Sequence, residues 1–581
     1  MPISVLTAFL GLVSAVSIWA QAPAATTAAT SAYESGLAAM RAGDAAKAQP
    51  EFERAVKLSP NNAEMQLALG QVLVQRGDLD GAVTHLRAVV RLKPTLAVGH
   101  LFLGQALSAK GLQDEAIAQL SEATKLAPNE ADNHRALARA LSAQQKTPEA
   151  IAEMNAAVAL APNSSEAHDD LGSLLAQSGQ LAEAEQQFQS ALKIDPQYEP
   201  SHFHLGVARL SAGDVAAAQN ELITATELNP KDGRAFYYLG DAYQTAGDKV
   251  AALHAYEHAG ALLPESATLQ TKLGLLFQRA GDDEKAAVAF RKVIAITPED
   301  ADAHNNLGLA LMQHGEGEAA IKEFKEAIRL RPEDAAFRGN LGIAYMQLSD
   351  FDAAVDNLQG ALKMAPNDAS LHYDLGLALK LKDNLPAGIA EMKKAVQLDP
   401  QLVDAYYTLG NTMWQQGEFP AAIEYLRKAV DLKPDYAEAY YTMGTVLKQM
   451  NQLPEAAQSL REAIRLQPQI AGTHTTLAAV LRQMGDTAGA EAESKLGDAL
   501  VKEKIGQQGA TLATNSGKRM LNAGDLDGAI SQFRNAIKIS PSYAPAHYQL
   551  AVALSRKGDK AEAAVEFKKA AEVDPRLKPT Q

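Results

Sequence analysis

Histidine is the residue type whose number and spacing in this sequence first suggest chemistry. The chain has 13 histidines and no cysteine, so thiolate nucleophiles, disulfides and iron–sulfur clusters are excluded, and any metal would need imidazole and carboxylate ligands. Neighbouring units of packed helices stand roughly 10 Å apart, too far for histidines of two units to share a zinc ion with bonds of about 2 Å. Eight histidines share one position of a 34-residue sequence period that is described below, and we interpret them as packing residues. They are His100, His134, His168, His202, His304, His372, His474 and His547.

Other short patterns resemble fragments of reactive sites. His254 and His258 are four residues apart and could chelate a metal together, but no third ligand and no H-E-x-x-H motif accompany them. The segment from Gly509 to Lys518 ends in Asn-Ser-Gly-Lys, yet it lacks the G-x-x-x-x-G-K-[ST] pattern that cradles phosphates. No G-x-S-x-G nucleophile motif occurs. The sequence predicts no metal, no cofactor and no enzymatic activity.

Length and charge limit the kind of protein and partner. The chain has 581 residues, more than one compact core usually holds, so it contains several domains or an array of repeats. Hydrophobic residues make up 47% and charged residues 21%, a balance typical of folded proteins. The net charge of -15 argues against a basic surface that grips phosphate backbones, so no nucleic-acid partner is predicted.

The first 22 residues have the features of an export signal. Residues 3–18 carry no charge, and this run is shorter than the roughly 20 residues needed to span hydrocarbon. The sequence ending at Ala22 suits cleavage, although a cut after Ala20 competes and no Lys or Arg precedes the run. We predict a signal peptide over 1–22, an Ala/Thr/Pro-rich linker over 23–32, and an exported, periplasmic or secreted protein. The alternative is a membrane anchor formed by an uncleaved leader, which would be the only membrane contact.

Proline spacing shows how the rest of the chain is organised. Prolines recur every 34 residues at 60, 94, 128, 162, 196, 230, 264, 298, 332, 366, 400, 434 and 468, and then stand at 541 and 575. Thirteen prolines at one constant interval do not arise by chance, so the 34-residue period reflects a repeated structural unit. It divides the chain into sixteen repeats, fourteen over 29–504 and two over 510–577. The repeats are numbered here in chain order, with positions 1–34 inside each.

Each repeat has the apolar spacing of two amphipathic helices. In repeat 12 (403–436), Leu409 and Met413 belong to one stripe, while Ala422 and Leu426 belong to a second. Position 15 is glycine in twelve repeats and is often followed by aspartate. Glycine can take the left-handed conformation that ends the first helix, and the aspartate can accept bonds from the first amides of the second. The proline at position 32 opposes continuation of the second helix.

Small residues at fixed positions indicate close packing of the two helices. Position 8 is glycine in thirteen repeats and alanine in the other three, and position 20 is alanine except at Gly388. Glycine inside a helix costs about 1 kcal/mol relative to alanine, so this regularity needs a gain from close backbone approach. Together with leucine at position 7, a bulky residue at 24 and proline at 32, the pattern resembles the tetratricopeptide repeat, W-x2-L-G-x2-Y, A-x3-F and P in 34 residues.

This resemblance implies an all-α fold, an α-solenoid in which antiparallel helix pairs stack into a right-handed superhelix. It also implies that the first helices line a concave groove that binds protein segments. Positions 2, 5, 6, 9, 12 and 13 are then expected to face the groove, and position 6 becomes a polar ladder from repeat 9 onward, with Asp374 and Thr408 among its members. The expected groove residues are Tyr237, Asn306, Asn340, Tyr373, Lys380, Tyr407, Asn411, Trp414, Tyr441 and Lys448. Scattered charges such as Arg135, Arg139, Lys272 and Arg279 are interpreted as a solvated face.

The register is interrupted near the C-terminus. Residues 487–508 are rich in Ala, Glu, Lys and Leu, and Lys502 replaces the proline, so a longer helix is expected. Gly506 and Gly509 then predict a bend, which gives fourteen repeats over 29–504, a break or hinge at 505–509, a pair of repeats over 510–577 and a tail over 578–581. Either the break is a repaired insertion without a role, or it is a hinge that adjusts the groove.

Two functions remain open from the sequence. The first is a non-catalytic exported scaffold or adaptor whose groove binds protein or extended peptide segments, in the assembly of an envelope or export complex as the resemblance to bacterial repeat proteins implies. The second is an architectural spacer that self-associates without recognising a peptide.

Overall fold

The computed structural model describes residues 24–577, and all of its regular structure is helical. Within these residues there are 31 helices and no strand, so the predicted all-α fold is confirmed. The predicted signal peptide and the tail over 578–581 lie outside the described residues. The predicted linker over 23–32 is wrong for residues 24–32, because these residues belong to helix α1, which begins at Ala24. Alanine is the strongest helix former, and the alanine-rich start of α1 follows that preference.

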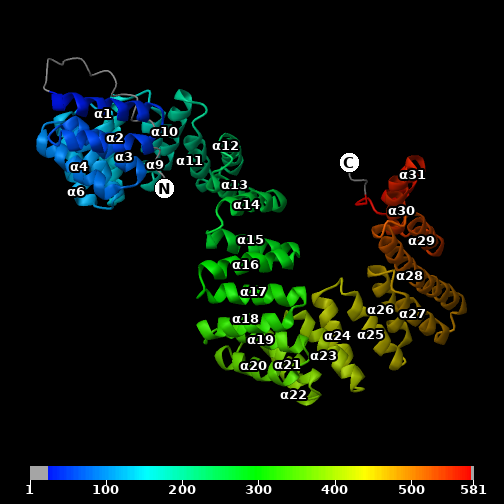
Figure 1. Cartoon of the computed structure of the whole chain (residues 1–581). Coiled ribbons are helices and arrows are strands. Elements are labelled where there is room, and N and C mark those ends of the chain that lie inside the picture. Colours follow the sequence, from blue (N-terminus) through cyan, green and yellow to red (C-terminus); the bar gives the residue numbers. More distant parts are fainter. Residues whose placement is uncertain (1–23, 578–581) are drawn as a thin grey trace. The chain divides into compact units, whose positions relative to one another are not determined.

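The chain divides into two compact units between Pro298 and Glu299. Figure 1 labels most of the helices of both units. The N-terminal unit contains α1 Ala24–Arg41, α2 Ala45–Leu58, α3 Ala63–Arg76, α4 Leu79–Leu92, α5 Ala97–Ala109, α6 Gln113–Leu126, α7 Ala131–Ala143, α8 Thr147–Leu160, α9 Ser165–Gln177, α10 Leu181–Ile194, α11 Glu199–Ser211, α12 Val215–Leu228, α13 Gly233–Ala246, α14 Lys249–Leu262, α15 Ala267–Ala280 and α16 Asp283–Ile296. The C-terminal unit contains α17 Ala301–His314, α18 Gly317–Leu330, α19 Ala335–Gln347, α20 Phe351–Met364, α21 Ala369–Leu381, α22 Leu385–Leu398, α23 Val403–Gln415, α24 Phe419–Leu432, α25 Ala437–Gln449, α26 Leu453–Leu466, α27 Ala471–Gln483, α28 Thr487–Asn522, α29 Leu526–Ile539, α30 Ala544–Lys557 and α31 Lys560–Val573. No described helix is both long enough and apolar enough to cross a bilayer.

Each repeat folds as one helical hairpin, and position 15 makes its turn. All twelve glycines at this position have positive φ, and an added Cβ there would meet no atom within 4 Å. In the other four repeats Gln145, Ser349, Asp383 and Asn451 adopt the same left-handed conformation, with φ of 61–67°. The turn geometry is therefore kept even where the residue is not glycine. The aspartate that follows often caps the second helix, as in Asp78, which accepts a bond from the backbone N–H of Gly81 at 2.9 Å.

Close packing inside each hairpin explains the glycine at position 8. A Cβ on Gly308 would lie 2.6 Å from Cε1 of Phe324, the position-24 residue of the same repeat. Phe324 itself is fully buried. The second helix can place an aromatic or leucine side chain directly against the backbone of the first helix only because position 8 has no side chain. The predicted packing role of this glycine is confirmed.

The eight periodic histidines are part of the packing, and they are hydrogen-bonded as well as buried or half-buried. His134 donates from Nε2 to the Pro128 carbonyl oxygen at 2.9 Å, and its Nδ1 lies 2.6 Å from a carboxylate oxygen of Glu153. Each such ring joins a first helix to its own second helix and to the proline turn of the preceding repeat. The same two contacts are made by His202, His372, His474 and His547, and His304 faces Glu323 in the same way. His100 and His168 also bond the proline carbonyl, but their Nδ1 atoms face the side-chain oxygens of Gln119 and Gln187.

The first helices form the inner side of each unit. Successive first helices contact each other, for example α9 with α11 and α19 with α21, whereas successive second helices within the described residues make no comparable contact. Elements that stand closer together lie on the inside of a curve, so the first helices line the concave side of a bent stack. This agrees with the arrangement that the family resemblance implied.

The predicted bend at 505–509 is wrong, because α28 runs unbroken for 36 residues. Its first part pairs with α27 and its last part pairs with α29. Lys502 stands where other repeats have proline, so nothing stops the helix at that point. The two glycines instead face the end of α29, where a Cβ on Gly509 would lie 3.2 Å from the Ile539 side chain. None of the residues 498–508 is buried, so the middle of α28 is supported by few tertiary contacts.

Candidate functional site

The inner face is built from side chains that meet across neighbouring first helices. The residue at position 5 of one repeat meets the residue at position 6 of the next, which is 35 residues later in the chain. We call such a pair a rung. The residue at position 9 of the first repeat often joins it, because it lies one turn further along the same helix face. Whether a rung is complete decides whether its polar groups are free to meet a ligand.

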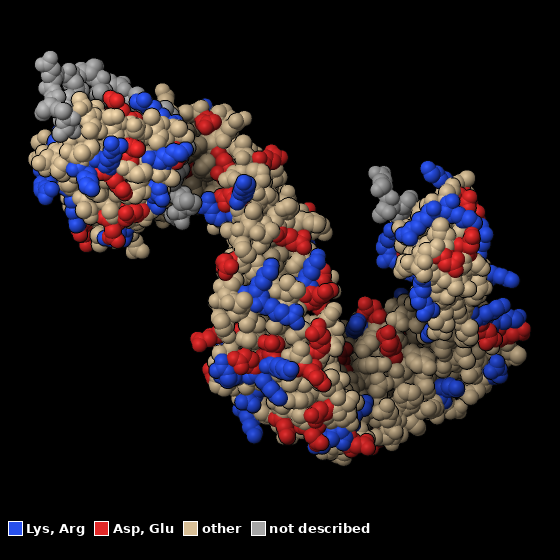
Figure 2. Space-filling view, in the orientation of Figure 1, with Lys and Arg blue, Asp and Glu red and all other residues tan. Residues whose placement is uncertain are grey.

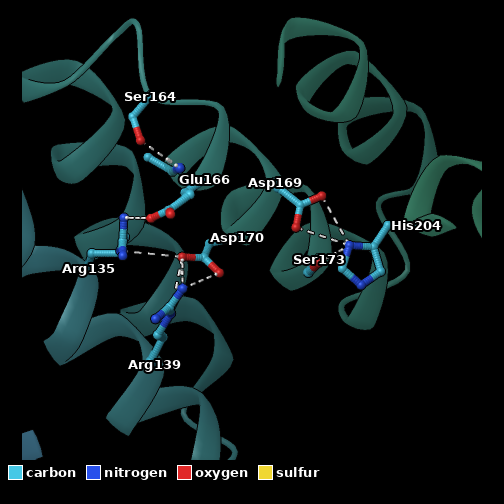
Figure 3. A network of polar contacts seen from close by, with 9 residues as sticks. Arg135, Arg139, Ser164, Glu166, Asp169, Asp170, Ser173 and His204 are labelled. Atoms are coloured by element: carbon cyan, nitrogen blue, oxygen red, sulfur yellow. Dashed lines mark hydrogen bonds and ion pairs between the residues drawn. The ribbon is translucent and has the colours of Figure 1, made fainter. Parts of the chain in front are cut away.

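The first described rung of charged residues joins α7 to α9. Arg135 lies 3.6 Å from the Asp170 carboxylate, and Arg139 at position 9 pairs with the same carboxylate at 2.7 Å (Figure 3). Arg135 also pairs with Glu166 at 2.6 Å. Burial raises the pKa of Asp170 in spite of the two guanidinium groups. Arg135 and Arg139 are therefore engaged in an inter-repeat network, and the interpretation as a merely solvated face is wrong for the largely covered Arg135, whereas the Arg139 side chain is still 50% exposed.

The next rung joins α9 to α11 and resembles a catalytic triad only in composition. Asp169 and Asp170 are adjacent on α9 and point to opposite neighbours, Asp169 toward His204 and Asp170 toward the arginines (Figure 3). His204 Nδ1 lies 3.0 Å from Asp169 and 3.4 Å from the Ser173 hydroxyl. A triad needs carboxylate and nucleophile on different ring nitrogens, and here both oxygens share one. Asp169 also accepts a bond from the buried Ser201 hydroxyl at 2.8 Å, so this rung links helices and does not assemble a nucleophile.

Two further rungs of the N-terminal unit are completed by aromatic rings. Phe203 and Tyr238 meet with ring centroids 5.7 Å apart, and the Lys272 ammonium lies 4.4 Å from the Tyr237 ring centre. Lys272 also donates to Asp241 at position 9. Burial opposes the charge of Lys272, but its bond to Asp241 and its contact with Tyr237 outweigh burial and raise its pKa. Tyr237, expected to face a ligand, is thus already covered by a cation of its own chain.

The C-terminal unit has two rungs that are closed by uncharged groups. The Asn340 amide donates to the Asn305 side-chain oxygen at 2.8 Å, and the Tyr373 hydroxyl lies 3.2 Å from the Thr408 hydroxyl. Asn340 and Tyr373 were expected to bond a peptide, but each already has a partner on the neighbouring repeat. Asn306, also expected in the groove, is half-buried on α17.

The rung between α19 and α21 is open. Its position-6 residue is Asp374, and its position-5 residue is Gly339, which has no side chain to offer. Within the described residues Asp374 makes no hydrogen bond and no ion pair, although the residue is half-buried. Burial, together with a smaller effect of the nearby Asp368, raises the pKa of Asp374 to about 6. This carboxyl is the clearest unpaired charged group on the inner face.

Position 12 carries a half-buried lysine in two repeats of the same unit. Lys380 on α21 has no hydrogen bond or ion pair to any described residue, and burial lowers its pKa. Lys448 on α25 is half-buried and likewise has no described partner. The amide of Asn411 on α23 lies on the same face and makes no side-chain bond within the described chain. These three expected groove residues therefore keep polar groups that a ligand can engage.

Aromatic residues gather next to these groups. Six of the 16 tyrosines fall within residues 406–441, and several pack with Trp414 against the core of repeats 12–14. The Tyr407 and Tyr436 rings pack at a tilt of 44° with centroids 4.8 Å apart, and the Trp414 N–H donates to the Gln449 side-chain oxygen at 2.8 Å. Tyr441 is half-buried on α25 in the same cluster. Figure 2 shows few charged side chains over α23–α27, compared with the mixed charges over α16–α22.

Asp374 was part of the polar ladder seen in the sequence but was not singled out as a site residue. The signal that marks it is the glycine 35 residues earlier, since Gly339 stands where flanking repeats have Asn305 and Tyr373. That signal becomes visible only when position 5 of one repeat is compared with position 6 of the next.

The histidines show no metal-binding cluster. Within residues 24–577, no three His, Asp or Glu side chains are grouped as a metal site requires. The His258 ring stacks on Phe236 with centroids 5.3 Å apart, and His254 faces Glu257 at 3.6 Å. These two rings are occupied by neighbours of their own helix and the paired one.

Comparison of the sequence with family profiles identifies the repeat. Three profiles described as tetratricopeptide repeat match the chain. The first matches residues 33–97, 135–199, 271–335 and 340–403, the second matches 175–242, and the third matches 99–130, 437–470 and 544–577. A profile described as TPR repeat matches 414–451 and 517–558. Because these matches span most of the array, the chain belongs to the tetratricopeptide repeat family. It is a repeat scaffold suited to protein–protein interaction, and proteins of this family generally bind protein partners without catalysing a reaction.

Solved structures share parts of this architecture. The Cut9–Hcn1 hetero-tetramer of the APC/C is 15% identical, with 78% of this chain and 96% of that chain covered, at a TM-score of 0.36. Yeast Tom70 is 18% identical over 73% of this chain and 96% of its own, at a TM-score of 0.32. MamA is 29% identical over 30% of this chain and 94% of its own, at a TM-score of 0.27. Likeness at this level says nothing about partners. No curated protein sequence matches the chain.

Proposed function

We propose that this chain is a non-catalytic scaffold that binds an extended polypeptide segment along the inner face of its C-terminal unit. The observation that carries the proposal is the set of half-buried polar groups left without partners there, chiefly Asp374, Lys380 and Asn411. Leaving such groups unpaired costs free energy in the unbound protein, and a ligand that pairs them recovers it. The inner face of the N-terminal unit offers fewer such groups, because the polar rungs of repeats 4–8 are closed by their own side chains.

The adjacent aromatic cluster supplies the apolar part of such a site. Tyr407, Trp414 and Tyr441 lie on successive first helices next to Asn411 and Lys448. Aromatic side chains flanked by polar groups are typical of interface hot spots. First helices of neighbouring repeats stand roughly 10 Å apart and an extended peptide advances about 3.3 Å per residue, so each repeat would meet about every third residue of the segment.

A peptide array tests this function. Binding of the purified chain to immobilised peptides should be saturable, and it should be lost when Tyr407 and Trp414 are both replaced by alanine. The matched control is Tyr548→Ala, which removes a tyrosine from position 5 of repeat 16, outside the proposed site. Fluorescence of Trp414 gives a second readout once Trp19, the other of the two tryptophans, is replaced by phenylalanine. Equal loss in the control and the double variant would contradict the assignment to these repeats.

An architectural role is the alternative outcome of the same experiment. Exposed aliphatic side chains on α28 and α31, Leu512 at 72% and Val573 at 52% exposure, provide surface through which copies could associate. Self-association by sedimentation together with no peptide binding would favour that role over groove recognition.

We further propose that the chain acts outside the cytoplasm, in assembly of an envelope or export complex. The support is the uncharged run over 3–18 followed by small residues at Ala20 and Ala22. Fractionation with N-terminal sequencing of the mature protein tests the proposal. A cytoplasmic protein that retains its first residues would overturn it, and a membrane-bound one with an intact N-terminus would show that the leader is an anchor.

A further inference from the structure

The sixteen repeats place aspartate at position 6 only twice, at Asp170 and at Asp374. The rung at Asp170 shows what this carboxylate accepts when it is complete. Arg135 at position 5 of the preceding first helix lies 3.6 Å from it, and Arg139 at position 9 lies 2.7 Å from it. The molecule thus contains its own example of a guanidinium bound between two first helices by a position-6 aspartate.

The rung at Asp374 lacks both of these cations. Gly339 takes the place of Arg135, and Ile343 takes the place of Arg139. An ideal Cβ built on Gly339 would have one heavy atom within 4 Å, the Cδ2 of Leu371 at 2.7 Å. Gly339 itself is buried, so the Leu371 side chain partly covers the place of a position-5 Cβ, and Asp374 is approached from the solvent side of this rung.

The groups around Asp374 do not replace the missing cation. Asp368 on its own helix is acidic and adds to the effect of burial in raising the pKa of Asp374 to about 6. Asp404 of the next first helix and Asp374 both raise the pKa of Tyr373, after the larger effect of burial, so the local charge is negative on that side too. From α19, the neighbouring Asn340 is bonded to Asn305. The half-buried carboxyl of Asp374 therefore has acidic neighbours and no described cation to pair with it.

We propose that a basic side chain of the bound segment, arginine or lysine, completes the rung of Gly339 and Asp374 by entering the space that Arg135 fills at the equivalent rung. This inference rests on the proposed function and specifies its ligand: a segment with a basic residue at the point where it crosses from α19 to α21. Arginine is favoured over lysine, because Arg139 of the internal example donates to both oxygens of Asp170, from Nη2 at 3.0 Å and from Nε at 3.1 Å, and an ammonium group cannot form this fork.

Selection from a randomised library of twelve-residue peptides displayed on phage tests the proposal. The wild-type chain, Asp374→Asn and Asp431→Asn are used in parallel. Asp431→Asn removes an exposed carboxylate from the second helix α24, so it controls for the general loss of one negative charge. Wild type and Asp431→Asn should enrich peptides that share one basic residue at a fixed place, and Asp374→Asn should not.

The decisive comparison uses one enriched peptide and the same peptide with its arginine replaced by citrulline, which keeps the shape and removes the charge, and by lysine. Citrulline should weaken binding to wild type about tenfold or more, and lysine should weaken it less, because a charge-assisted bond is roughly twice as strong as a neutral one. Asp374→Asn should bind the arginine and citrulline peptides within about twofold of each other. Enriched peptides without a basic residue, or an equal citrulline effect in Asp374→Asn, would overturn the proposal.

A second variant tests the rung without relying on any peptide. Gly339→Arg should rebuild the pair of Arg135 and Asp170 inside the chain, provided that the Leu371 methyl group moves aside. It should raise the melting temperature in the wild-type background but not in Asp374→Asn, and it should compete away the arginine-containing peptides. Gly339→Ala separates the charge from the added bulk.

Failure of the underlying function would look different from failure of this inference. If no peptide is enriched on any variant, the groove does not bind segments and both ideas fail. If peptides are enriched and their binding depends on Tyr407 and Trp414 but not on a basic residue, only the inference about Asp374 fails.

Discussion

The inner faces of the two units differ in how their rungs are closed. In repeats 4–8 of the N-terminal unit, charged and aromatic side chains of successive first helices pair with each other, as in Arg135 with Asp170 and Tyr237 with Lys272. In the C-terminal unit the two closed rungs are neutral, and Asp374 has no hydrogen-bond or ion-pair partner among the residues that the structure describes. The same positions of the repeat therefore hold inter-repeat contacts in one unit and half-buried polar groups without described partners in the other. Membership in the family fixes where these side chains point but not what they meet.

The physical reason for this difference is competition for hydrogen-bonding capacity. A carboxylate that already accepts bonds from two side chains of its own chain gains little from a ligand. A half-buried carboxylate without partners has given up part of its hydration and gains the full interaction when a donor arrives. A complete rung thus favours a fixed stack, while an incomplete rung favours recognition.

The largest effect is expected from breaking a closed rung at Asp169. Asp169→Ala leaves the buried Ser201 hydroxyl and the His204 ring without their acceptor, which should lower the local free energy of unfolding by about 3 kcal/mol. Because arrays of repeats open locally, hydrogen exchange followed by mass spectrometry over α9–α11 is the suitable measurement.

Two controls define that result. Asp169→Asn keeps one acceptor oxygen and should lose less than the alanine variant. Asp132→Ala removes an exposed carboxylate from the same unit and should change exchange by less than about 0.5 kcal/mol. Equal exchange in wild type and Asp169→Ala would mean that the closed rungs do not support the stack.

The opposite sign is expected at Asp374. Its pKa in the folded protein is raised to about 6, whereas the unfolded chain has the usual value of about 3.9. Asp374 therefore does not change the free energy of unfolding below pH about 4. It lowers this free energy progressively as the pH rises toward 6, and the loss persists at higher pH because the folded state holds an unpaired carboxylate. Asp374→Asn removes this penalty and should stabilise α19–α21 by about 2 kcal/mol at pH 7.5, after a discount for partial exposure.

Hydrogen exchange at two pH values measures the Asp374 effect. The gain from Asp374→Asn should be present at pH 7.5 and absent near pH 4. A variant that is less stable than wild type at pH 7.5 would show that Asp374 has an internal partner and that the contrast between the units is false.

The extent to which sequence predicts these features follows from how far apart the interacting residues are. Local signals were sufficient for the hairpins: the proline at position 32 ends each second helix, and Gly77 and its equivalents take the left-handed turn within the same repeat. The packing histidines were also identified, because their spacing ruled out shared metal binding. Their bonds to proline carbonyls were not, because the partner lies in the preceding turn.

The inner face was harder to predict, because whether its side chains are paired depends on residues 35 positions apart in the sequence. Tyr237, Asn340 and Tyr373 have suitable residue types, yet each is occupied by a neighbouring repeat. Lys380 and Asn411 have similar types and remain unpaired. The prediction of a break at 505–509 failed for a related reason. Two glycines suggested a bend, but the helix continues through them because no proline stops it.

Two asparagines on the C-terminal face sharpen the comparison at a smaller scale. Asn340→Ala leaves the Asn305 side-chain oxygen without a donor and should cost about 1 kcal/mol in local stability. Asn411→Ala removes an amide without a described partner and should change stability by less than about 0.5 kcal/mol, while weakening peptide binding. Thermal unfolding and peptide titration of both variants separate the roles. A loss of binding in Asn340→Ala larger than in Asn411→Ala would reverse the assignment of strut and binding group.

The smallest effect is expected at the hairpin turns, and it compares the two units through their backbones. Gln145 in the N-terminal unit and Asn451 in the C-terminal unit both hold φ of 61° without being glycine. Gln145→Gly should stabilise its hairpin by about 0.5–1 kcal/mol, because an ordinary residue is strained in the left-handed region. Asn451→Gly should gain only a few tenths, because asparagine tolerates that region. Local exchange of α7–α8 against α25–α26 measures both, and a larger gain at Asn451 would indicate that turns of the C-terminal unit carry strain beyond their residue type.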